Sequence, residues 1–345
     1  MTRDIKQRKH DHLKLAQDDA LKFSKSAGFE RWDIIHNALP EINLSEIDTR
    51  LSFLGKHLNF PFIISSMSGG AAESFDFNAN LAEAAEQVGC ALGLGSIRAA
   101  LENESARASF LIAREKAPSA VILANLGIAQ IISANSMDQT AAFCDEIKAD
   151  GLIIHLNSLQ EAFQPEGEPH FKGALGAIQL WVSEFNLPII VKEVGQGLSG
   201  DVIHKLEDVG VRYVDIAGAG GSNWISIERE RLDDNQKVLR QVAHEFANWG
   251  EPTAAVLENL DTDLMVIASG GLKNPLDLPK ALALGANLGG LAGPLLKLAL
   301  QDDVSQLVEY LQVWHKTLEM AMFGTGVSTI SELTGNRKLL QRTKS

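Results

Sequence analysis

Eight short apolar runs recur along the chain, and an amphipathic segment follows each of them. The runs begin at residues 60, 91, 120, 151, 187, 211, 264 and 287. Their length and composition are typical of strands that are buried on both faces of a parallel sheet. The segments between them predict helices at about 78–89, 101–116, 138–148, 174–186, 199–210 and 274–286, with a further helix starting at Pro294. Eight alternating units favour a closed (β/α)8 TIM barrel over an open, doubly wound sheet.

Some segments lie outside this regular alternation. Residues 1–59 precede the first strand, and within them 39–48 are expected to form a loop or a strand that covers one end of the core. Residues 225–263 separate the sixth and seventh strands, which is too long for an ordinary connection and predicts an inserted loop or helix. A helical tail is expected at about 303–323. We therefore expect an N-terminal extension over 1–59 and a barrel domain over 60–345.

Composition and charge narrow the function classes. The chain has 345 residues and a net charge of −13, so a general role in binding nucleic acid or an anionic membrane is disfavoured. It contains no apolar run of 18 residues and no hydrophobic segment of signal-peptide type, so we expect a soluble, cytoplasmic protein. Cys90 and Cys144 form no Cys-x-x-Cys pair and are expected to be inert buried thiols.

The most informative stretch is 151–161, Gly-Leu-Ile-Ile-His-Leu-Asn-Ser-Leu-Gln-Glu. It begins as a buried strand and turns polar at its C-terminal end. Side chains alternate along a strand, so Ile153, His155 and Asn157 are expected to share one face. This arrangement is consistent with a core histidine that is hydrogen-bonded to an amide, or with the wall of a site. The carboxylate of Glu161 on the following turn favours the site.

Small or polar residues also follow the other apolar runs. In a barrel, the active site lies at the C-terminal ends of the strands. The residues predicted there are Ser66, Ser68, Ser96, Arg98, Asn125, His155, Asn157, Lys192, Ser222 and Ser269. Eight consecutive strands with such endings indicate a ligand site more strongly than any one of them.

Glycines after the last two strands predict a phosphate site. They occur in Ser269-Gly270-Gly271 and in 290–296, next to the helix that starts at Pro294. Backbone N–H groups and a helix N-terminus at these loops are the usual phosphate site of a barrel, although glycines could merely permit tight turns. Lys192, within an apolar run, needs an anionic partner. It is expected either to hold an electron-rich flavin ring or to form a structural ion pair.

Glu161 is the candidate metal ligand. Magnesium takes one or two protein carboxylates and completes its shell with phosphate oxygens and waters. A lone glutamate therefore predicts a site for a metal–diphosphate complex, whereas the alternative is a solvated loop glutamate. The basic N-terminal cluster, Arg3, Lys6, Arg8 and Lys9 with His10 and His12, is by charge alone a solvated tail.

Taken together, the motifs resemble those of the type 2 isopentenyl-diphosphate isomerases, a family of FMN-dependent (β/α)8 enzymes. The resemblance rests on RKHDH, SSMSGG, LGSIRAA, ANLG, HLNSLQE, VKEVGQG, AGAGGSNW, SGG and GLAGP, and it extends over nearly the whole chain. It implies conversion of isopentenyl diphosphate to dimethylallyl diphosphate by adding and removing a proton. It also implies reduced FMN, Mg²⁺ and NADPH as the reductant. The family forms homo-oligomers, often tetramers or octamers.

The resemblance assigns roles to individual residues. FMN contacts are implied for Ser66, Met67, Ser68, Ser96, Asn125, Lys192, Ser222, Gly270, Gly271, Ala292 and Gly293. Substrate contacts are implied for Arg8, Lys9, Arg98, His155, Asn157 and Gln160. Glu161 would bind Mg²⁺, and Trp224 and Glu228 would help to close the site. Gln160, His155 and Lys192 are the candidate catalytic residues. Gln160 has no useful pKa and could only position groups or relay protons.

Some positions depart from the family pattern. Ile97 stands where glutamine is common, and Ser68 and Ser222 stand where threonine is usual. Asn223 lies between Ser222 and Trp224. Residues 272–275 replace a common basic segment near the expected phosphate site. None of these changes removes a residue that the chemistry needs.

A competing hypothesis is an FMN-dependent 2-hydroxy acid oxidase or dehydrogenase of the same barrel type. Such an enzyme needs a base, usually histidine, and an arginine for the substrate carboxylate after strands six and seven. AGAGGSNW contains no histidine, and SGGLKN offers only Lys273, which disfavours it. A non-catalytic phosphate- or flavin-binding barrel is the third possibility.

Overall fold

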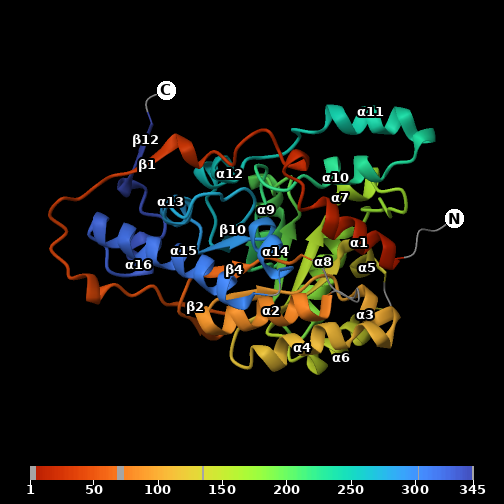
Figure 1. Ribbon diagram of the computed structural model, residues 1–345, viewed down its shortest axis with the longest axis horizontal. Helices are drawn as coiled ribbons and strands as arrows, with labels where there is room; N and C mark the ends of the chain where they lie inside the picture. Colours follow the sequence, from red (N-terminus) through yellow and green to blue (C-terminus); the bar gives the residue numbers. More distant parts are fainter. Residues whose placement is uncertain (1–4, 68–73, 134–135, 302, 344–345) are drawn as a thin grey trace.

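A computed structural model describes residues 5–67, 74–133, 136–301 and 303–343. Eight parallel strands form a closed barrel in the order β10-β11-β4-β5-β6-β7-β8-β9, so the predicted (β/α)8 fold is confirmed (Figure 1). The strands are β4 (Phe62–Ile64), β5 (Ala91–Gly93), β6 (Ile122–Gly127), β7 (Gly151–Leu156), β8 (Ile189–Glu193), β9 (Tyr213–Asp215), β10 (Met265–Ala268) and β11 (Leu288–Leu291).

The interior of the barrel is packed with apolar side chains, and a hairpin closes its N-terminal end as a floor. One inward-facing residue from each of seven strands contributes to the packed cluster: Ile63, Ala91, Leu123, Ile153, Ile190, Ile267 and Leu288. A hairpin of β2 (Leu51–Phe53) and β3 (Lys56–Leu58) adds the fully buried Phe53 and Leu58 to this cluster. The loop expected at 39–48 is largely irregular, and the strands that cover the core follow it in the chain.

A polar layer lies directly above this apolar one. Strand side chains repeat every two residues, so the next inward position on each strand is two residues further along. Those positions hold Ser65, Gly93, Asn125, His155, Lys192, Asp215, Ser269 and Gly290. Each strand therefore changes from an apolar to a small or polar inward side chain over two residues. This change brings all these residues together at the C-terminal mouth of the barrel.

Helices surround the barrel in the predicted alternation. They are α2 (Ser74–Val88), α3 (Arg98–Glu102), α4 (Ala108–Lys116), α5 (Ile128–Ile132), α6 (Met137–Glu146), α7 (Ser158–Phe163), α8 (Ala174–Glu184), α9 (Gly200–Asp208), α13 (Asp277–Leu284), α14 (Gly293–Ala299), α15 (Val304–Thr325) and α16 (Ile330–Leu333). The single helix expected at 101–116 is wrong. The side chain of Asn103 accepts from the Ser105 N–H and starts a 3-10 turn that separates α3 from α4.

The turn that is expected to carry Glu161 forms a short helix. Glu161 lies in the short helix α7, whose hydrogen bonds run from the Glu161 N–H to the Asn157 carbonyl and from the Gln164 N–H to the Gln160 carbonyl. The polar part of the 151–161 stretch is therefore a strand end that turns at once into a helix. This turn brings the side chains of residues 157, 160 and 161 to one side.

The predicted insertion after the sixth barrel strand is confirmed. It contains α10 (Trp224–Arg231) and α11 (Lys237–Glu245), and it precedes α12 (Thr253–Asn259). The side chain of Asn223 caps α10 by accepting from the Ile225 and Ser226 N–H groups. Its amide also donates to the Ala247 carbonyl at 2.5 Å. Asn223 thus connects the start of the insertion to the segment that follows α11.

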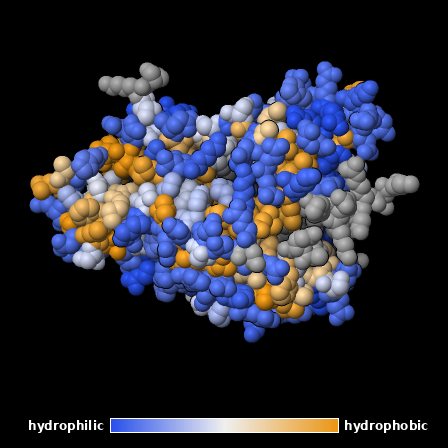
Figure 2. Space-filling model, in the orientation of Figure 1, coloured by the Kyte–Doolittle hydropathy of each residue, from blue (hydrophilic) through white to orange (hydrophobic). Residues whose placement is uncertain are grey.

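The N-terminal extension wraps the barrel instead of forming a separate unit. Its β1 (Trp32–Ile34) pairs antiparallel with β12 (Leu340–Arg342) near the C-terminus. At its start, α1 (Ile5–Leu15) lies beside α10 at the barrel mouth (Figure 1). The visible surface is mainly hydrophilic, with apolar residues in small groups (Figure 2). No helix in the described part of the chain is both long and apolar enough to cross a bilayer.

Candidate active site

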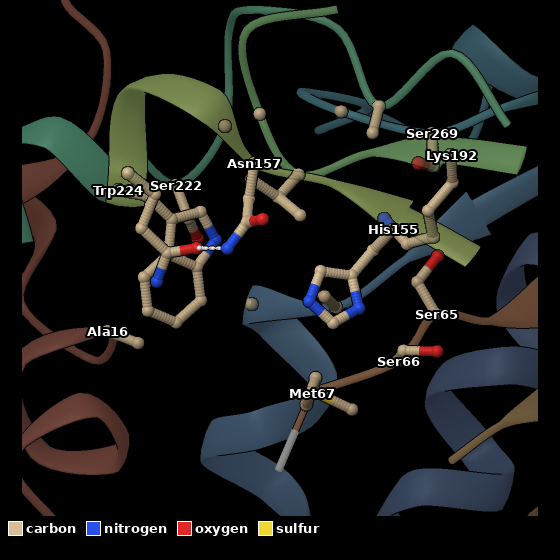
Figure 3. Close-up of a pocket in the computed structure, with 18 of the residues that line it drawn as sticks. Ala16, Ser65, Ser66, Met67, His155, Asn157, Lys192, Ser222, Trp224 and Ser269 are labelled. Carbon is tan, nitrogen blue, oxygen red and sulfur yellow. Dashed lines mark hydrogen bonds between the residues drawn. The ribbon is translucent and has the colours of Figure 1, made fainter. Parts of the chain in front are cut away.

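A cavity of about 290 Å³ opens at the C-terminal ends of the barrel strands. The predicted flavin, substrate and metal residues with described side chains all line it: Arg8, Ser66, Met67, Ser96, Arg98, Asn125, His155, Asn157, Gln160, Glu161, Lys192, Ser222, Gly270, Gly271, Ala292 and Gly293. Figure 3 shows His155, Lys192, Ser65 and Ser66 in one part of this cavity and Trp224 with Ser222 in another. Ser68 lies outside the described residues, and so does the side chain of Lys9.

His155 is held as a neutral ring. Its Nδ1 lies 2.7 Å from Oδ1 of Asn125. An amide oxygen can only accept, so Nδ1 carries the proton and Nε2 carries a lone pair. Burial, and then the positive charge of Lys192 on the neighbouring strand, lower the pKa of His155 from 6.5 to about 3. The ring is therefore a hydrogen-bonding group at neutral pH and not a cation.

Lys192 has an anionic partner on the neighbouring strand β9. Its ammonium lies 3.9 Å from a carboxylate oxygen of Asp215 on β9, and both side chains are buried. Asp215 also accepts from Ser269 Oγ at 2.6 Å. Burial raises the pKa of Asp215, although Lys192 and Ser269 oppose this effect. The only signal in the sequence was an aspartate inside an apolar run, at 213–216.

Glu193, next to Lys192, shapes the rim of the cavity. One of its carboxylate oxygens accepts from four successive backbone N–H groups, those of residues 194–197. The loop is thereby folded around a buried carboxylate, and its second residue, Gly195, lines the cavity. The neighbouring Lys192 donates to the Glu193 carbonyl at 2.6 Å, so the same loop fixes the ammonium.

The loop after β10 and the end of β4 have features that suit FMN. Gly270 and Gly271 have φ values of +91° and +80°, and an added Cβ would lie 2.1 Å and 2.6 Å from backbone atoms of the preceding strand loop. Their backbone is thus packed closely where a phosphate would lie. The buried hydroxyls of Ser65 and Ser66 have no hydrogen-bond partner among the described residues. Unsatisfied buried hydroxyls facing a cavity are suited to a polar ligand.

A second set of polar side chains, Asn157, Gln160 and Glu161, lies at the start of α7 and within it. The amide of Asn157 donates to Oε1 of Glu161 at 2.8 Å and to Oε1 of Gln160 at 3.2 Å. The other carboxylate oxygen of Glu161 accepts from the Glu168 N–H at 2.7 Å. Gly167 makes this turn possible, because a Cβ there would lie 1.9 Å from the Glu161 carbonyl oxygen. Glu161 is therefore a fixed carboxylate that keeps acceptor capacity, as a hard cation such as Mg²⁺ requires.

The cationic side of this group comes from α3 and α1. The guanidinium of Arg98 contacts Glu168 at 3.1 Å and Glu102 at 2.8 Å. Arg8 and His12 of α1 line the cavity, and the His12 ring packs edge-on against Trp224 with a centroid distance of 5.1 Å. The interpretation of the N-terminal cluster as a solvated tail is wrong for α1, which covers the mouth. Glu228 does not line the cavity, but it accepts from Gln160 at 3.2 Å.

Curated relatives match over almost their full length. The isopentenyl-diphosphate delta-isomerase of Chlorobium phaeovibrioides is 41% identical and is covered over 98% of each chain. That of Pseudescherichia vulneris is 42% identical over 95% of this chain and 94% of the relative. Residues 1–117 and 157–342 match the FMN-dependent dehydrogenase family. The chain belongs to the FMN-dependent isopentenyl-diphosphate delta-isomerases.

Solved structures of the wider fold agree with this assignment at the level of architecture. The recombinant flavin-binding domain of baker's yeast flavocytochrome b2 superposes with a TM-score of 0.66 at 18% identity, covering 96% of this chain and 82% of that one. The (S)-mandelate dehydrogenase gives 0.63 at 15% identity over 97% and 99%. These likenesses show the fold. The isomerase relatives distinguish this chain from the dehydrogenases that share it.

Proposed function

We propose that this enzyme converts isopentenyl diphosphate to dimethylallyl diphosphate with reduced FMN and Mg²⁺, and that NADPH supplies the electrons. The observation that carries the proposal is the division of one cavity. A glycine-rich rim with unsatisfied serines occupies one part, and a carboxylate–amide group with arginines occupies another. The first suits a flavin phosphate and ring, and the second suits a diphosphate with its metal ion.

At the flavin part, Gly270, Gly271, Ala292 and Gly293 would bind the phosphate through backbone N–H groups. The side chains proposed to contact the rest of FMN are Ser66, Met67, Ser68, Ser96, Asn125, Lys192 and Ser222. Lys192 is held by Asp215 and by the Glu193 carbonyl, so its charge has a fixed position. When bound, reduced FMN supplies an electron-rich ring that can exchange protons and stabilise nearby positive charge.

At the substrate part, Glu161 would provide the single protein carboxylate for Mg²⁺, and diphosphate oxygens and waters would complete the shell. Arg8, Lys9 and Arg98 would neutralise the remaining charge. Glu102 and Glu168 hold Arg98 beside this group. His155 and Asn157 would add hydrogen bonds. Because His155 is neutral at pH 7, binding of a diphosphate beside it would favour proton uptake by its ring.

The reaction adds a proton to the terminal alkene carbon and removes one from the methylene on the other side of the branched carbon. Gln160 is placed to orient this part of the substrate. Its amide donates to Glu228 while its carbonyl accepts from Asn157, so both ends are fixed. Since an amide has no useful pKa, Gln160 orients groups or relays a proton but does not supply one. Lys192 would stabilise negative charge on the reduced cofactor.

The direct test measures flavin content and isomerisation in parallel. We expect the purified protein to retain FMN and to convert isopentenyl diphosphate only after reduction and with Mg²⁺ present. Conversion with oxidised flavin, or by protein stripped of flavin, would refute the proposed mechanism. The two reductants are compared by adding NADPH or NADH under anaerobic conditions and measuring how fast the flavin absorbance decreases.

Oxidation of 2-hydroxy acids is the alternative chemistry of this barrel. The cavity residues after β9 and β10, within the described chain, are Ala217, Gly218, Gly221, Ser222, Trp224, Ser269, Gly270, Gly271, Leu272 and Lys273. This set contains neither the histidine base nor the arginine that such oxidation needs. We expect no flavin reduction by lactate or mandelate under conditions in which NADPH reduces it. We also propose a homotetramer or octamer, which light scattering after gel filtration tests.

A further inference from the structure

A group of charged side chains, buried at its centre, joins the N-terminal helix to the insertion. We call it the arm cluster: Asp11 and His12 of α1, Glu166 of the loop after α7, and Glu228 and Arg231 of α10. The Arg231 guanidinium contacts Glu228 and Glu166 at 2.5 Å each. Its Nε lies 3.8 Å from Asp11, and His12 Nε2 lies 2.8 Å from Glu228. The cluster connects three segments that are far apart in the chain.

Arg231 is the central charge of this arm cluster. Its side chain is 1% exposed, and that of Glu228 is 0% exposed. Burial alone would raise the pKa of Glu228, but His12 and Arg231 outweigh burial and lower it. Without Arg231, the carboxylates of Asp11, Glu166 and Glu228 would lie together beside the His12 ring. Breaking a buried pair in this way is strongly unfavourable.

The arm cluster is linked to the cavity by hydrogen bonds. Oε1 of Glu228 accepts from Gln160, and Oε1 of Gln160 accepts from Asn157. Arg8 lies on the same α1 helix as Asp11, one turn earlier, and lines the cavity. We propose that Arg231 is a positioning residue, which holds α1 against α10 and thereby fixes both Gln160 and Arg8 at the substrate part of the cavity. Its effect on substrate binding rests on the proposed function.

The test compares two arginines of the same helix in FMN-loaded enzyme. Arg231→Gln removes the buried charge, and Arg229→Gln is the matched control because Arg229 pairs with Glu230 on the surface. Limited trypsin digestion with mass spectrometry follows cleavage after Arg8. We expect Arg231→Gln to accelerate this cleavage at least about tenfold and Arg231→Lys to restore part of the protection. Equal cleavage of Arg231→Gln and the control variant overturns the proposal.

Steady-state kinetics supply the second measurement. We expect Arg231→Gln to raise the KM for isopentenyl diphosphate by about tenfold or more, with flavin content unchanged. An unchanged KM overturns the link to the substrate part. If Arg231→Gln does not fold, Asp11→Asn carries the test, because Asp11 lies on α1 and is partly exposed. Faster cleavage after Arg8 then supports the proposal, and unchanged cleavage overturns it. Digestion needs no turnover, so failure of the isomerase activity would not affect it.

Discussion

Acid should destabilise this protein through His155, and the effect has a calculable size. Folding lowers the pKa of this ring from 6.5 to about 3, because burial and Lys192 disfavour the charged form. Below pH 6.5 the unfolded chain therefore binds a proton that the folded chain does not. The contribution of the neutral His155 ring to the free energy of unfolding is therefore complete above pH 6.5. It is lost as the pH falls toward 3. Each pH unit in that window costs about 1.4 kcal/mol, so a change from pH 6.5 to 5 costs about 2 kcal/mol.

Urea unfolding at pH 7.5 and pH 5, at a fixed excess of FMN, measures this loss. His155→Gln removes the titrating group but keeps an amide that can bond to Asn125, while the other ionisable groups remain. The wild type should lose about 2 kcal/mol more than this variant between the two pH values. His57→Gln is the matched control, since His57 is exposed on the floor hairpin and its ring lies in water in both states. It should behave as the wild type.

Equal losses in the wild type and His155→Gln would refute the reasoning, because the neutral ring would then have no linkage to folding. A larger loss in the variant would have the wrong sign and would refute it as well. The test concerns the protonation of one ring and does not depend on the identity of the substrate.

Three further substitutions test the site and the core. Glu161→Gln should lower Mg²⁺-dependent activity at least about tenfold while FMN stays bound, and loss of flavin would show that the metal and flavin parts are wrongly mapped. Arg8→Ala should raise the substrate KM about ten- to hundredfold, as for a lost charge-assisted hydrogen bond; an unchanged KM would mean that α1 does not contact substrate. Phe53→Ala should lower the free energy of unfolding by about 3–5 kcal/mol in urea titrations, since Phe53 is fully buried in the barrel floor. Phe75→Ala, at an exposed phenylalanine of α2, is its control and should change stability little.

The barrel could be predicted from sequence because its signal is local. Each strand carries its own apolar run, and the polar residue at its end is two positions beyond an inward apolar one. His155 follows Ile153 in this way, and Lys192 follows Ile190. The closed order of strands then brings these ends together without further information. The same rule applied to Tyr213 would have found Asp215.

Other features depend on contacts between distant segments and left no comparable pattern. The floor hairpin reaches the barrel interior from residues 51–58, and nothing local in that segment indicates which core it covers. The arm cluster joins residue 11 to residue 231. Because its charged residues are far apart in the sequence, the sequence alone predicts separate surface groups. The break between α3 and α4 gives no such pattern either, because Asn103 caps a new turn in a segment that otherwise has helical periodicity.

The β2–β3 hairpin that closes the lower end of the barrel limits how cofactor and substrate can enter and leave. In the described part of the chain, Phe53 and Leu58 fill the lower end, and the cavity opens at the other. FMN and substrate would therefore enter and leave through the same opening, which α1 partly covers. Movement of α1 would then affect the exchange of either ligand, because Arg8, His12, Leu13 and Ala16 of this helix line the cavity.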